Sequence, residues 1–281
     1  MELHLQAVPP STFTPRPGPV LVVVADGVGE APDAPSNAVT RAHAPVLHGL
    51  LQTPLATTLR AHGTAVGLPS DDDMGNSEVG HNALGAGRVF EQGAKLVQTA
   101  IETGAMFEGP VWKALTERVR ASGQPLHFLG LLSDGNVHSH IEHLFAMIRR
   151  CHAENVPRVR VHVLLDGRDV PETSALEYVA PLEALLAELN AQGRDYRIAS
   201  GGGRMKLTMD RYEADWAMVE RGWAHHVRGE GRAFASATEA VHALRDEHPG
   251  VIDQDLPGFV VADANGPVGR IEDGSAVVFF N

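Results

Sequence analysis

The sequence has a single cysteine, few aromatic residues and no long apolar segment. With only Cys151 among 281 residues, no intrachain disulfide can form, and a reducing compartment is expected. Aromatic residues make up 5% of the chain, and no apolar run approaches the ~20 residues that a membrane span requires. The first 19 residues lack the basic and then apolar pattern of a secretory signal. We therefore expect a cytoplasmic protein without a membrane partner.

Positive charge is also in short supply. The chain has 23 Lys and Arg residues against 35 Asp and Glu residues, and its net charge is −12. This balance disfavours binding to nucleic acid or to an anionic membrane surface. A small anionic substrate would need a local cluster of arginines. The apolar content of 43% and charged content of 21% are those of an ordinary globular protein.

Short apolar runs alternate with longer amphipathic stretches along the chain. This alternation predicts an α/β protein with a mainly parallel sheet. The predicted strands are residues 20–25, 126–132, 159–165 and 196–200, and the predicted helices are residues 141–153, 173–192, 210–223 and 238–246. Asp or Arg stands next to glycine after each predicted strand. Because ligands bind beyond the carboxyl ends of parallel strands, this repetition indicates an enzyme.

Residues 67–95 differ from the rest, since they read as a loop that leads into a Gly- and Ala-rich turn. Ser77 follows a glycine turn and could open a helix, which makes it a candidate nucleophile; an ordinary helix cap is the alternative. A serine nucleophile needs a base or a metal. Asp26, after the first predicted strand, could bind a divalent cation that also binds the Ser77 oxygen, or it could cap the next segment. We place a domain boundary near residue 91.

The loop after residues 126–132 contains Asp134, His138 and His140. These residues could form a metal cluster, a substrate loop in which His138 donates a hydrogen bond or a proton, or simply the start of a helix. After the next strand, Arg168 and Asp169 suit a carboxylate or phosphate group, although a surface Arg–Asp pair would also explain them.

Arg204 and Arg211 follow a triple glycine, residues 201–203. Glycines allow the backbone to approach an anion closely, and arginines bind phosphate through two hydrogen bonds. The spacing matches neither a phosphate-binding P-loop nor a dinucleotide-binding fingerprint. These residues could form an arginine cluster for a small anion, or they could simply start the next helix.

Several of these motifs together resemble those of the 2,3-bisphosphoglycerate-independent (cofactor-independent) phosphoglycerate mutases. Residues 73–88 are similar to the signature around the phosphorylated serine of that family. The resemblance continues, in the correct order, through Ala25–Gly27, Gly130–Gly135, Val137–His140, Leu165–Asp169 and Gly201–Arg204. The last of these, with Met209–Tyr212, resembles the plant-type branch.

The resemblance implies an incomplete alkaline-phosphatase-like segment, residues 1–90, and an α/β transferase domain, residues 91–281, whose C-terminal part would be missing. Ser77 would be the catalytic residue, and Asp26 and Ser77 would bind a divalent metal, Mn²⁺, of which the full-length family holds two. The implied substrate-binding residues are His138, Arg168, Asp169, Arg204 and Arg211. The implied reaction interconverts 3-phosphoglycerate and 2-phosphoglycerate in glycolysis through a phosphoserine.

Members of that family run to nearly twice this length, and the remaining metal ligands would lie in the part not present here. We therefore expect either a mutase completed by its missing half or by a second chain, or a catalytically silent fragment that binds phosphoglycerate. A metal-dependent phosphohydrolase is a third alternative. The predicted strand at residues 20–25 would lack its sheet neighbours, so we expect it to be exposed on an apolar face, to self-associate through an exposed sheet edge, or to be poorly ordered.

Overall fold

The computed structural model describes residues 17–19, 21–25, 27–29, 35–210 and 212–280, and the chain divides into two compact units, residues 1–59 and 60–281. In the first unit, the described residues form two short helices, α1 (Ala38–Arg41) and α2 (Pro45–Leu51). Residues 21–25 form neither helix nor strand, so the strand predicted there is wrong for these residues. The expected exposure is confirmed, because Leu21 is 84% exposed and Val23 is 77% exposed.

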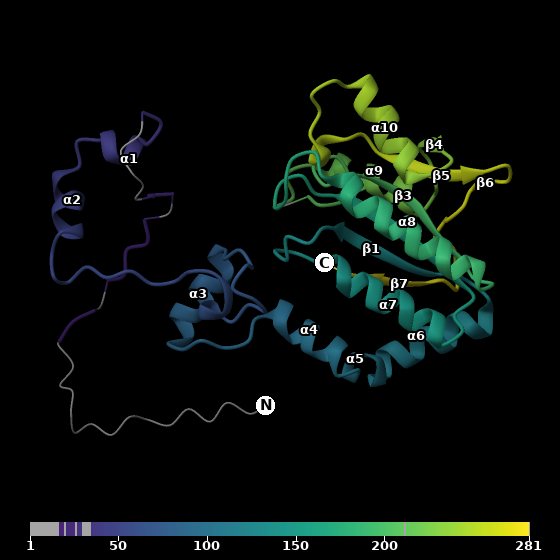
Figure 1. The fold of residues 1–281 in the computed structure, drawn as a ribbon, viewed down its shortest axis with the longest axis horizontal. Helices are drawn as coiled ribbons and strands as arrows, with labels where there is room; N and C mark the ends of the chain where they lie inside the picture. The colour runs from purple at the N-terminus through teal and green to yellow at the C-terminus, as the bar shows by residue number, and fades with distance from the viewer. Residues whose placement is uncertain (1–16, 20, 26, 30–34, 211, 281) are drawn as a thin grey trace. The chain divides into compact units, whose positions relative to one another are not determined.

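The second unit is built on a mainly parallel sheet, as the sequence predicts (Figure 1). Its strands are β1 (Leu126–Leu132), β2 (Arg158–Leu165), β3 (Asp195–Gly203), β4 (Arg232–Phe234), β5 (Phe259–Asp263), β6 (Gly266–Pro267) and β7 (Ala276–Phe279). The order is β4-β5-β3-β2-β1-β7, with β6 beside β5. Among the described strands, β5 is antiparallel to β3 and β6, and the other pairs are parallel.

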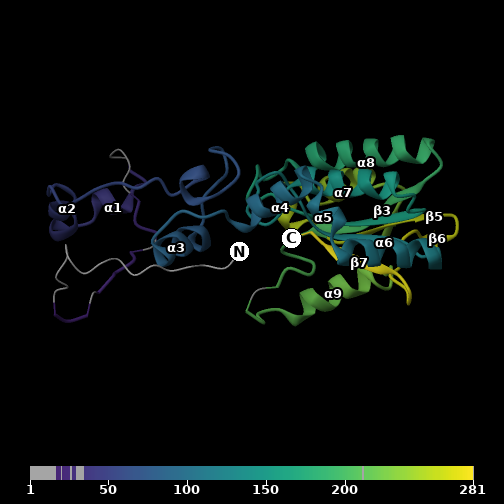
Figure 2. The same ribbon diagram turned by 90° about the horizontal axis from the view of Figure 1, so that it is seen from below.

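Helices cover both faces of this sheet. The helices of the second unit are α3 (Ser77–Ala86), α4 (Gly93–Glu102), α5 (Ala105–Glu108), α6 (Pro110–Ser122), α7 (Ile141–Ala153), α8 (Ala175–Ala191), α9 (Trp216–His226) and α10 (Ala237–Glu247), with 3₁₀ turns η1 (Gly63–Val66) and η2 (Asp253–Asp255). Figure 2 shows α7 and α8 on one face and α9 on the other. The larger core therefore lies under α7 and α8.

The predicted elements with strong periodicity are confirmed. Strand 126–132 and helix 141–153 have the predicted bounds, whereas the short strand predicted at 196–200 extends over Asp195–Gly203. The helix predicted from residue 210 begins only at Trp216. Asp215 caps it by accepting a hydrogen bond from the Met218 amide, and the residues before it include left-handed backbone angles that a helix cannot contain.

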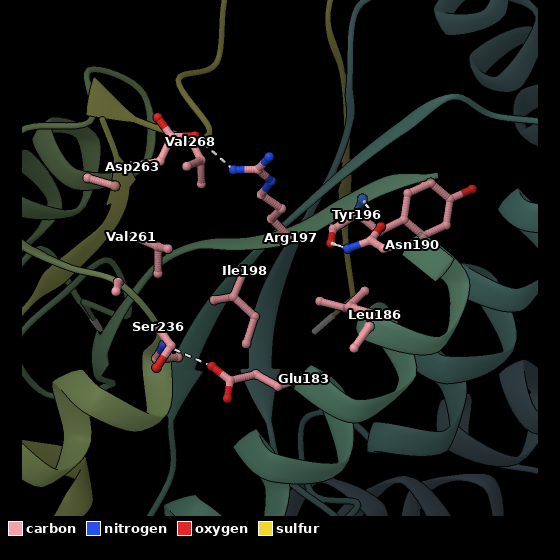
Figure 3. A pocket seen from close by; sticks show the side chains of 14 residues that line it. Glu183, Leu186, Asn190, Tyr196, Arg197, Ile198, Ser236, Val261, Asp263 and Val268 are labelled. Carbon is pink, nitrogen blue, oxygen red and sulfur yellow. Dashed lines mark hydrogen bonds and ion pairs between the residues drawn. The ribbon is translucent and has the colours of Figure 1, made fainter. Parts of the chain in front are cut away.

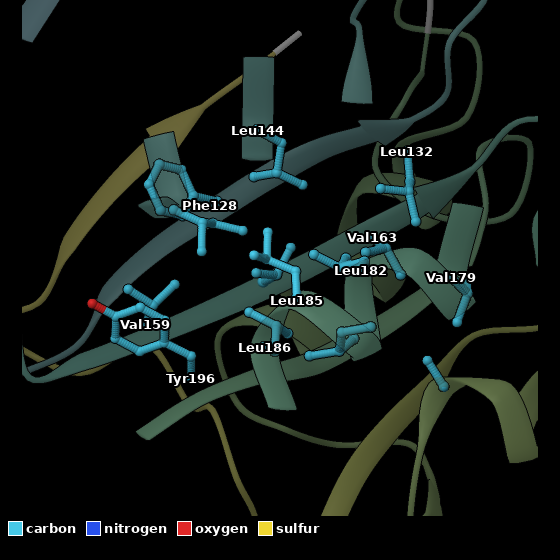
Figure 4. Packing of buried hydrophobic residues seen from close by; sticks show 14 of the residues in the cluster. Phe128, Leu132, Leu144, Val159, Val163, Val179, Leu182, Leu185, Leu186 and Tyr196 are labelled. Carbon is cyan, nitrogen blue, oxygen red and sulfur yellow. The ribbon is translucent and has the colours of Figure 1, made fainter. Parts of the chain in front are cut away.

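The core on the α7 and α8 side is a single apolar cluster, part of which Figure 4 shows. Phe128 on β1 and Leu144 on α7 are both fully buried in it. Cys151 is also buried there, and burial raises the pKa of its thiol, which suits a packing role. Under the opposite face lies a smaller cluster of Leu129, Leu131, Leu164 and Leu207. Among the described residues, no helix is long and apolar enough to cross a membrane.

Candidate active site

Three strand ends meet at one edge of the sheet, and Asp166 lies at the centre of that edge. It follows β2 directly and is buried. Its Oδ2 accepts a hydrogen bond from Ser133 Oγ at 2.6 Å, and its Oδ1 accepts one from Arg204 Nη1 at 2.8 Å. Burial raises the pKa of Asp166, but the hydrogen bonds from Ser133, from the Asp169 amide and from Arg204 outweigh it, so the pKa is lowered. The carboxylate is therefore ionised, and its hydrogen bonds connect the loops that follow β1, β2 and β3.

Arg204 is placed by the triple glycine before it. A side chain on Gly203 would put its Cβ 2.2 Å from the Gln254 carbonyl oxygen, so only glycine allows the segment around η2 to approach this closely. The Arg204 side chain is buried, and its Nη1 donates to Asp169 Oδ2 at 2.6 Å as well as to Asp166. A guanidinium held between two carboxylates is fixed in position, which is what recognition of an anion at a set place requires.

His138 reaches the same group from the loop after β1. Its Nε2 lies 3.9 Å from Asp169 Oδ2, and its side chain is 45% exposed. Arg168 is exposed at this edge, and within the described part of the chain its side chain forms no hydrogen bond or ion pair. The structure thus brings His138, Asp169 and Arg204 together, with Arg168 beside them. Arg211 lies outside the described residues.

The alternative of a metal cluster in the loop after β1 finds no support in the structure. Asp134 Oδ1 accepts a hydrogen bond from Tyr178 Oη at 2.7 Å, and burial together with Asp134 raises the pKa of Tyr178 to about 12. His140 caps α7, because its Nδ1 accepts a hydrogen bond from the Glu142 amide. Among the described residues, no group of three or more His, Cys, Asp or Glu side chains could hold a metal ion.

Ser77 is the first residue of α3 and not its cap. Asn76 is the cap, since its Oδ1 accepts a hydrogen bond from the Val79 amide at 3.1 Å. The Ser77 hydroxyl is left without a hydrogen-bond partner among the described residues, on an exposed residue at a helix N-terminus. The turn before it requires Gly75, where a Cβ would lie 1.8 Å from the Ala61 carbonyl oxygen. Asp26, the other predicted metal ligand, lies outside the described residues.

The segment that carries Ser77 is joined to the loop that carries His138. Asn136 Nδ2 donates to Asp73 Oδ1 at 2.6 Å, and Asp73 stands four residues before Ser77. Residues from both segments, among them Glu78 and His138, line one cavity of about 480 Å³. The residues on either side of Ser77, Asn76 and Glu78, and the His138 loop therefore share a space that is large enough for a small ligand, and Ser77 itself does not line it.

A second cavity of about 210 Å³ lies away from these residues, between α8, the start of β3 and the start of α10 (Figure 3). Its polar groups are paired with each other. Glu183 accepts hydrogen bonds from the Ala237 and Thr238 amides, and Arg197 Nη1 donates to Asp263 Oδ2 at 2.9 Å. None of the predicted site residues lines this cavity, and its contacts are those of packed structural elements.

The sequence interpretation did not select Ser133, Asp166 and Tyr178 as site residues. Ser133 and Asp166 are each the first residue after a buried strand, and both are buried polar residues at the end of a parallel sheet. That position was a usable signal. Tyr178 lies inside the helix α8, 44 residues from its partner Asp134, and no local pattern announces this contact.

Comparison with known proteins decides the family. Residues 97–281, which are more than half of the chain, match the family model described as BPG-independent PGAM N-terminus. The chain belongs to this family. The resemblance seen in the sequence motifs is thereby confirmed, including the mixed α/β fold that it implies.

Curated relatives within this family are similar over nearly the whole of this chain. The probable 2,3-bisphosphoglycerate-independent phosphoglycerate mutase of Leptospira interrogans is 55% identical over 271 residues, which are 96% of this chain and 50% of that protein. The mutase of Trypanosoma brucei is 51% identical, covering 93% and 48%. Mutase 1 of Arabidopsis thaliana is 50% identical, covering 95% and 48%. The chain therefore spans about half the length of the curated relatives it matches.

A solved structure is also similar. Phosphoglycerate mutase of Leishmania mexicana, determined at low cobalt concentration, superposes with a TM-score of 0.78 and is 52% identical. The match covers 80% of this chain and 41% of that one. The fold described above is thus the fold of this family.

Proposed function

We propose that this chain provides the phosphorylated serine and the substrate-binding edge of an enzyme that interconverts 3-phosphoglycerate and 2-phosphoglycerate. The observation that carries the proposal is the shared cavity, which is lined from one side by residues next to Ser77 and from the other by His138. The relatives that are named phosphoglycerate mutases support it.

In this proposal, Ser77 is the nucleophile. Its Oγ forms a bond to phosphorus as the bond between phosphorus and the glycerate oxygen breaks, and the serine proton passes to that oxygen. The reverse transfer to the other glycerate hydroxyl completes the isomerisation. The helix N-terminus at Ser77 places backbone amides and the positive end of a dipole near the phosphoserine, which stabilises its negative charge.

The substrate would be held by the charged group at the sheet edge. Arg168 is exposed and free to pair with a carboxylate or phosphate group, and Arg204 is fixed beside it by two carboxylates. His138, next to Asp169, is placed to form a hydrogen bond to a glycerate hydroxyl. We include Arg211 in this set from its sequence motif alone.

A divalent metal, which we take to be Mn²⁺, would lower the pKa of the Ser77 hydroxyl and neutralise the transferring phosphoryl group. The residues that the structure describes do not form such a site: Ser77 offers one oxygen, Asp26 lies outside them, and they contain no cluster of metal ligands. We therefore assign no step to the metal in this chain.

This misfit favours a second candidate, a catalytically silent unit that binds phosphoglycerate. A polypeptide equivalent to the remaining half of the relatives would then be the partner that completes the enzyme, and we keep self-association through an exposed sheet edge as the other proposed partnership. We also propose a cytoplasmic setting, which a single, unpaired and buried cysteine supports.

A coupled assay distinguishes the two candidates. The 281-residue chain is incubated with 3-phosphoglycerate and Mn²⁺, 2-phosphoglycerate is detected with enolase, and the peptide containing Ser77 is weighed by mass spectrometry. Turnover and a phosphorylated Ser77 peptide, both lost in Ser77→Ala, support the mutase. Release of inorganic phosphate without isomerisation indicates a phosphohydrolase.

Binding tests the silent candidate. Titration calorimetry with 3-phosphoglycerate should show binding that Arg168→Met weakens, whereas Arg118→Met, an exposed change on α6, should leave it unchanged. If the chain neither binds nor turns over phosphoglycerate, the proposed function is wrong for this polypeptide.

A further inference from the structure

A continuous series of hydrogen-bonded polar side chains crosses the face of the sheet that α9 covers, outside the site described above. It starts at His127 on β1, whose Nδ1 lies 2.9 Å from His162 Nε2 on β2. His162 Nδ1 lies 2.7 Å from Ser200 Oγ on β3, and Ser200 Oγ lies 2.7 Å from His226 Nδ1 on α9. The chain ends at Thr208, whose Oγ1 lies 3.0 Å from His226 Nε2.

Proton counting shows which state of the rings this chain requires. A neutral imidazole has one N–H donor and one bare nitrogen acceptor, so three neutral rings can be linked donor to acceptor along the whole path. An additional proton on any ring would make two hydrogen-bond donors face each other across one contact, or it would add a buried positive charge without an anionic partner. The neighbouring groups that act on the rings are Arg160 on β2 and His225 on α9, and positive charge on either one opposes protonation of the rings.

The pKa values agree with this geometry. Burial, and then Arg160, lowers the pKa of His127 to about 4, and burial, and then His225, lowers that of His226 to about 3. Burial, followed by the neighbouring histidines and Arg160, also lowers the pKa of His162 well below its usual value. All three rings are therefore neutral near pH 7.

Thr208, the last residue in this series of hydrogen-bonded side chains, has an unusual backbone conformation. Its φ of 68° is left-handed, a backbone region that a β-branched residue rarely adopts unless surrounding contacts enforce it. Two such contacts are present besides the His226 bond. The Thr208 amide donates to the Met218 carbonyl at 3.2 Å, and the hydroxyl packs on Gly222, where a Cβ would lie only 2.1 Å from Oγ1. Three residues of helix α9, Met218, Gly222 and His226, thus contact Thr208 and hold it in this conformation.

The segment held in this way comes directly after Arg204. Leu207 is buried in the smaller apolar cluster, whereas Lys206 is exposed and pairs with Asp255 at 3.3 Å. Leu207 and Thr208 are therefore two of the attachments of residues 205–210, besides the Met205 amide, which donates to the Gln254 carbonyl at 2.9 Å, and the Lys206 carbonyl, which accepts from Arg221 Nε at 3.1 Å. Release of the Thr208 hydroxyl would remove the side-chain hydrogen bond at the centre of this segment, which begins directly after the candidate substrate arginine.

We propose that His226 is a positioning residue: as the neutral end of the buried His127–His162–Ser200–His226 chain, it fixes Thr208 and thereby the segment 205–210 behind Arg204. The consequence for substrate binding rests on the proposed function, because it takes Arg204 to be part of a phosphoglycerate site. The positioning of the segment itself does not depend on the substrate.

Two matched pairs of variants test the contact itself. Thr208→Val keeps the side-chain shape but removes the hydroxyl, whereas Thr208→Ser keeps the hydroxyl. His226→Asn can place an amide near Nδ1 but cannot reach Thr208, whereas His226→Gln can place one near Nε2 and keep the bond. Amide hydrogen exchange of residues 205–210 at pH 7 should become about tenfold faster in Thr208→Val and His226→Asn. It should stay within about twofold of the wild-type rate in the Ser and Gln variants.

The controls separate positioning from general loss of stability. Exchange in β1 and α8 should not change in any of the four variants, and the exposed change His242→Asn on α10 should leave all rates as in the wild type. Equal exchange of residues 205–210 in all four variants would overturn the proposal. An equal rise in β1 and α8 would also overturn it, since His226 would then serve only the core.

A measurement on the wild-type chain avoids variants that fail to fold. The ring ¹⁵N shifts of His226 should report one neutral tautomer down to about pH 5, whereas a protonated ring at pH 6 would contradict the chain as drawn. Affinity for 3-phosphoglycerate should fall in Thr208→Val and be kept in Thr208→Ser. If the wild type does not bind phosphoglycerate, the proposed function fails, whereas the exchange pattern still decides the positioning role.

Discussion

Two apolar runs of similar composition have opposite fates in this chain. Residues 126–132 form β1, which pairs with β2 and β7, and Leu126 and Phe128 are fully buried. Residues 21–25 are just as apolar, but they form no strand, and Leu21 to Val24 are 57–84% exposed. A continuous apolar run shows that a segment is compatible with a buried strand. Whether it becomes one depends on neighbours that supply backbone partners and cover both faces.

The largest expected effect tests this comparison directly. Phe128→Ala should lower the free energy of unfolding of residues 60–281 by about 3–5 kcal/mol, because it removes a fully buried ring and leaves a cavity. Leu21→Ala should change it by less than about 0.5 kcal/mol, since this side chain is exposed. Urea unfolding followed by circular dichroism measures both. A comparable loss of stability in both variants would mean that residues 21–25 are buried in solution.

The second test contrasts two arginines of the site. Arg204→Met should cost about 3–5 kcal/mol, because it leaves the buried Asp166 and the neighbouring Asp169 without their cation. Arg168→Met, at the same edge but exposed, should cost less than about 0.5 kcal/mol. The measurement is again urea unfolding. If Arg204→Met proved as mild as Arg168→Met, the central role of Asp166 would have to be abandoned.

The third test uses acid to act on the buried histidine face. The folded pKa values of His226 and His127, about 3 and about 4, lie below the ordinary value of 6.5, so the unfolded chain binds more protons below pH 6.5. Stability is therefore full above about pH 7 and falls by about 1.4 kcal/mol per pH unit for each such histidine as the pH drops from about 6.5 to about 4.

Chemical unfolding at several pH values between 7.5 and 5 measures this slope. In His226→Gln the slope should be smaller by about one proton, that is by about 1.4 kcal/mol per pH unit. A flat profile in the wild type over this range would show that the rings are solvated. The lowered pKa of Asp166 acts in a different window, since its contribution is lost only below its ordinary value of 3.8.

The smallest expected effect concerns the helix that presents Ser77. Asn76→Ala removes the cap of α3 and should destabilise that helix by about 1 kcal/mol, seen as faster amide exchange in residues 77–86. The matched change Asn82→Ala, at an exposed interior position of the same helix, should not speed exchange, because alanine is the better helix former. Faster exchange in both variants would contradict Asn76 as the cap.

Much of the sheet and its helices could be predicted from periodicity alone. β1, β2 and α7 have long, regular apolar patterns, and the structure confirms them. The strands β4, β5 and β7 are short, at three to five residues, and they were not predicted, although the apolar, β-branched runs in β5 and β7 are typical of strands. The left-handed residues before α9, Thr208 among them, could not be foreseen, because threonine and tyrosine do not favour that backbone region.

For the candidate site, the positions of the polar residues at strand ends could be predicted from the sequence, but the partners with which they pair could not. The position of Asp169 next to Arg168 suggested a local ion pair, whereas the structure pairs Asp169 with Arg204, 35 residues away. The role of Ser77 as a site residue, with its hydroxyl left free by Asn76, remains a prediction, as do the domain boundary near residue 91 and the roles of Asp26 and Arg211.

The sequence by itself determined which segments can form buried strands and helices, and it placed Asp166, Arg168 and Asp169 in one loop, because these are short-range properties of neighbouring residues. Tertiary structure alone decided that Arg204 lies between two carboxylates, that Thr208 is held by His226, and that the run at residues 21–25 stays exposed. Those outcomes depend on groups far apart in the chain, whose attraction becomes strong only when folding brings them together away from water.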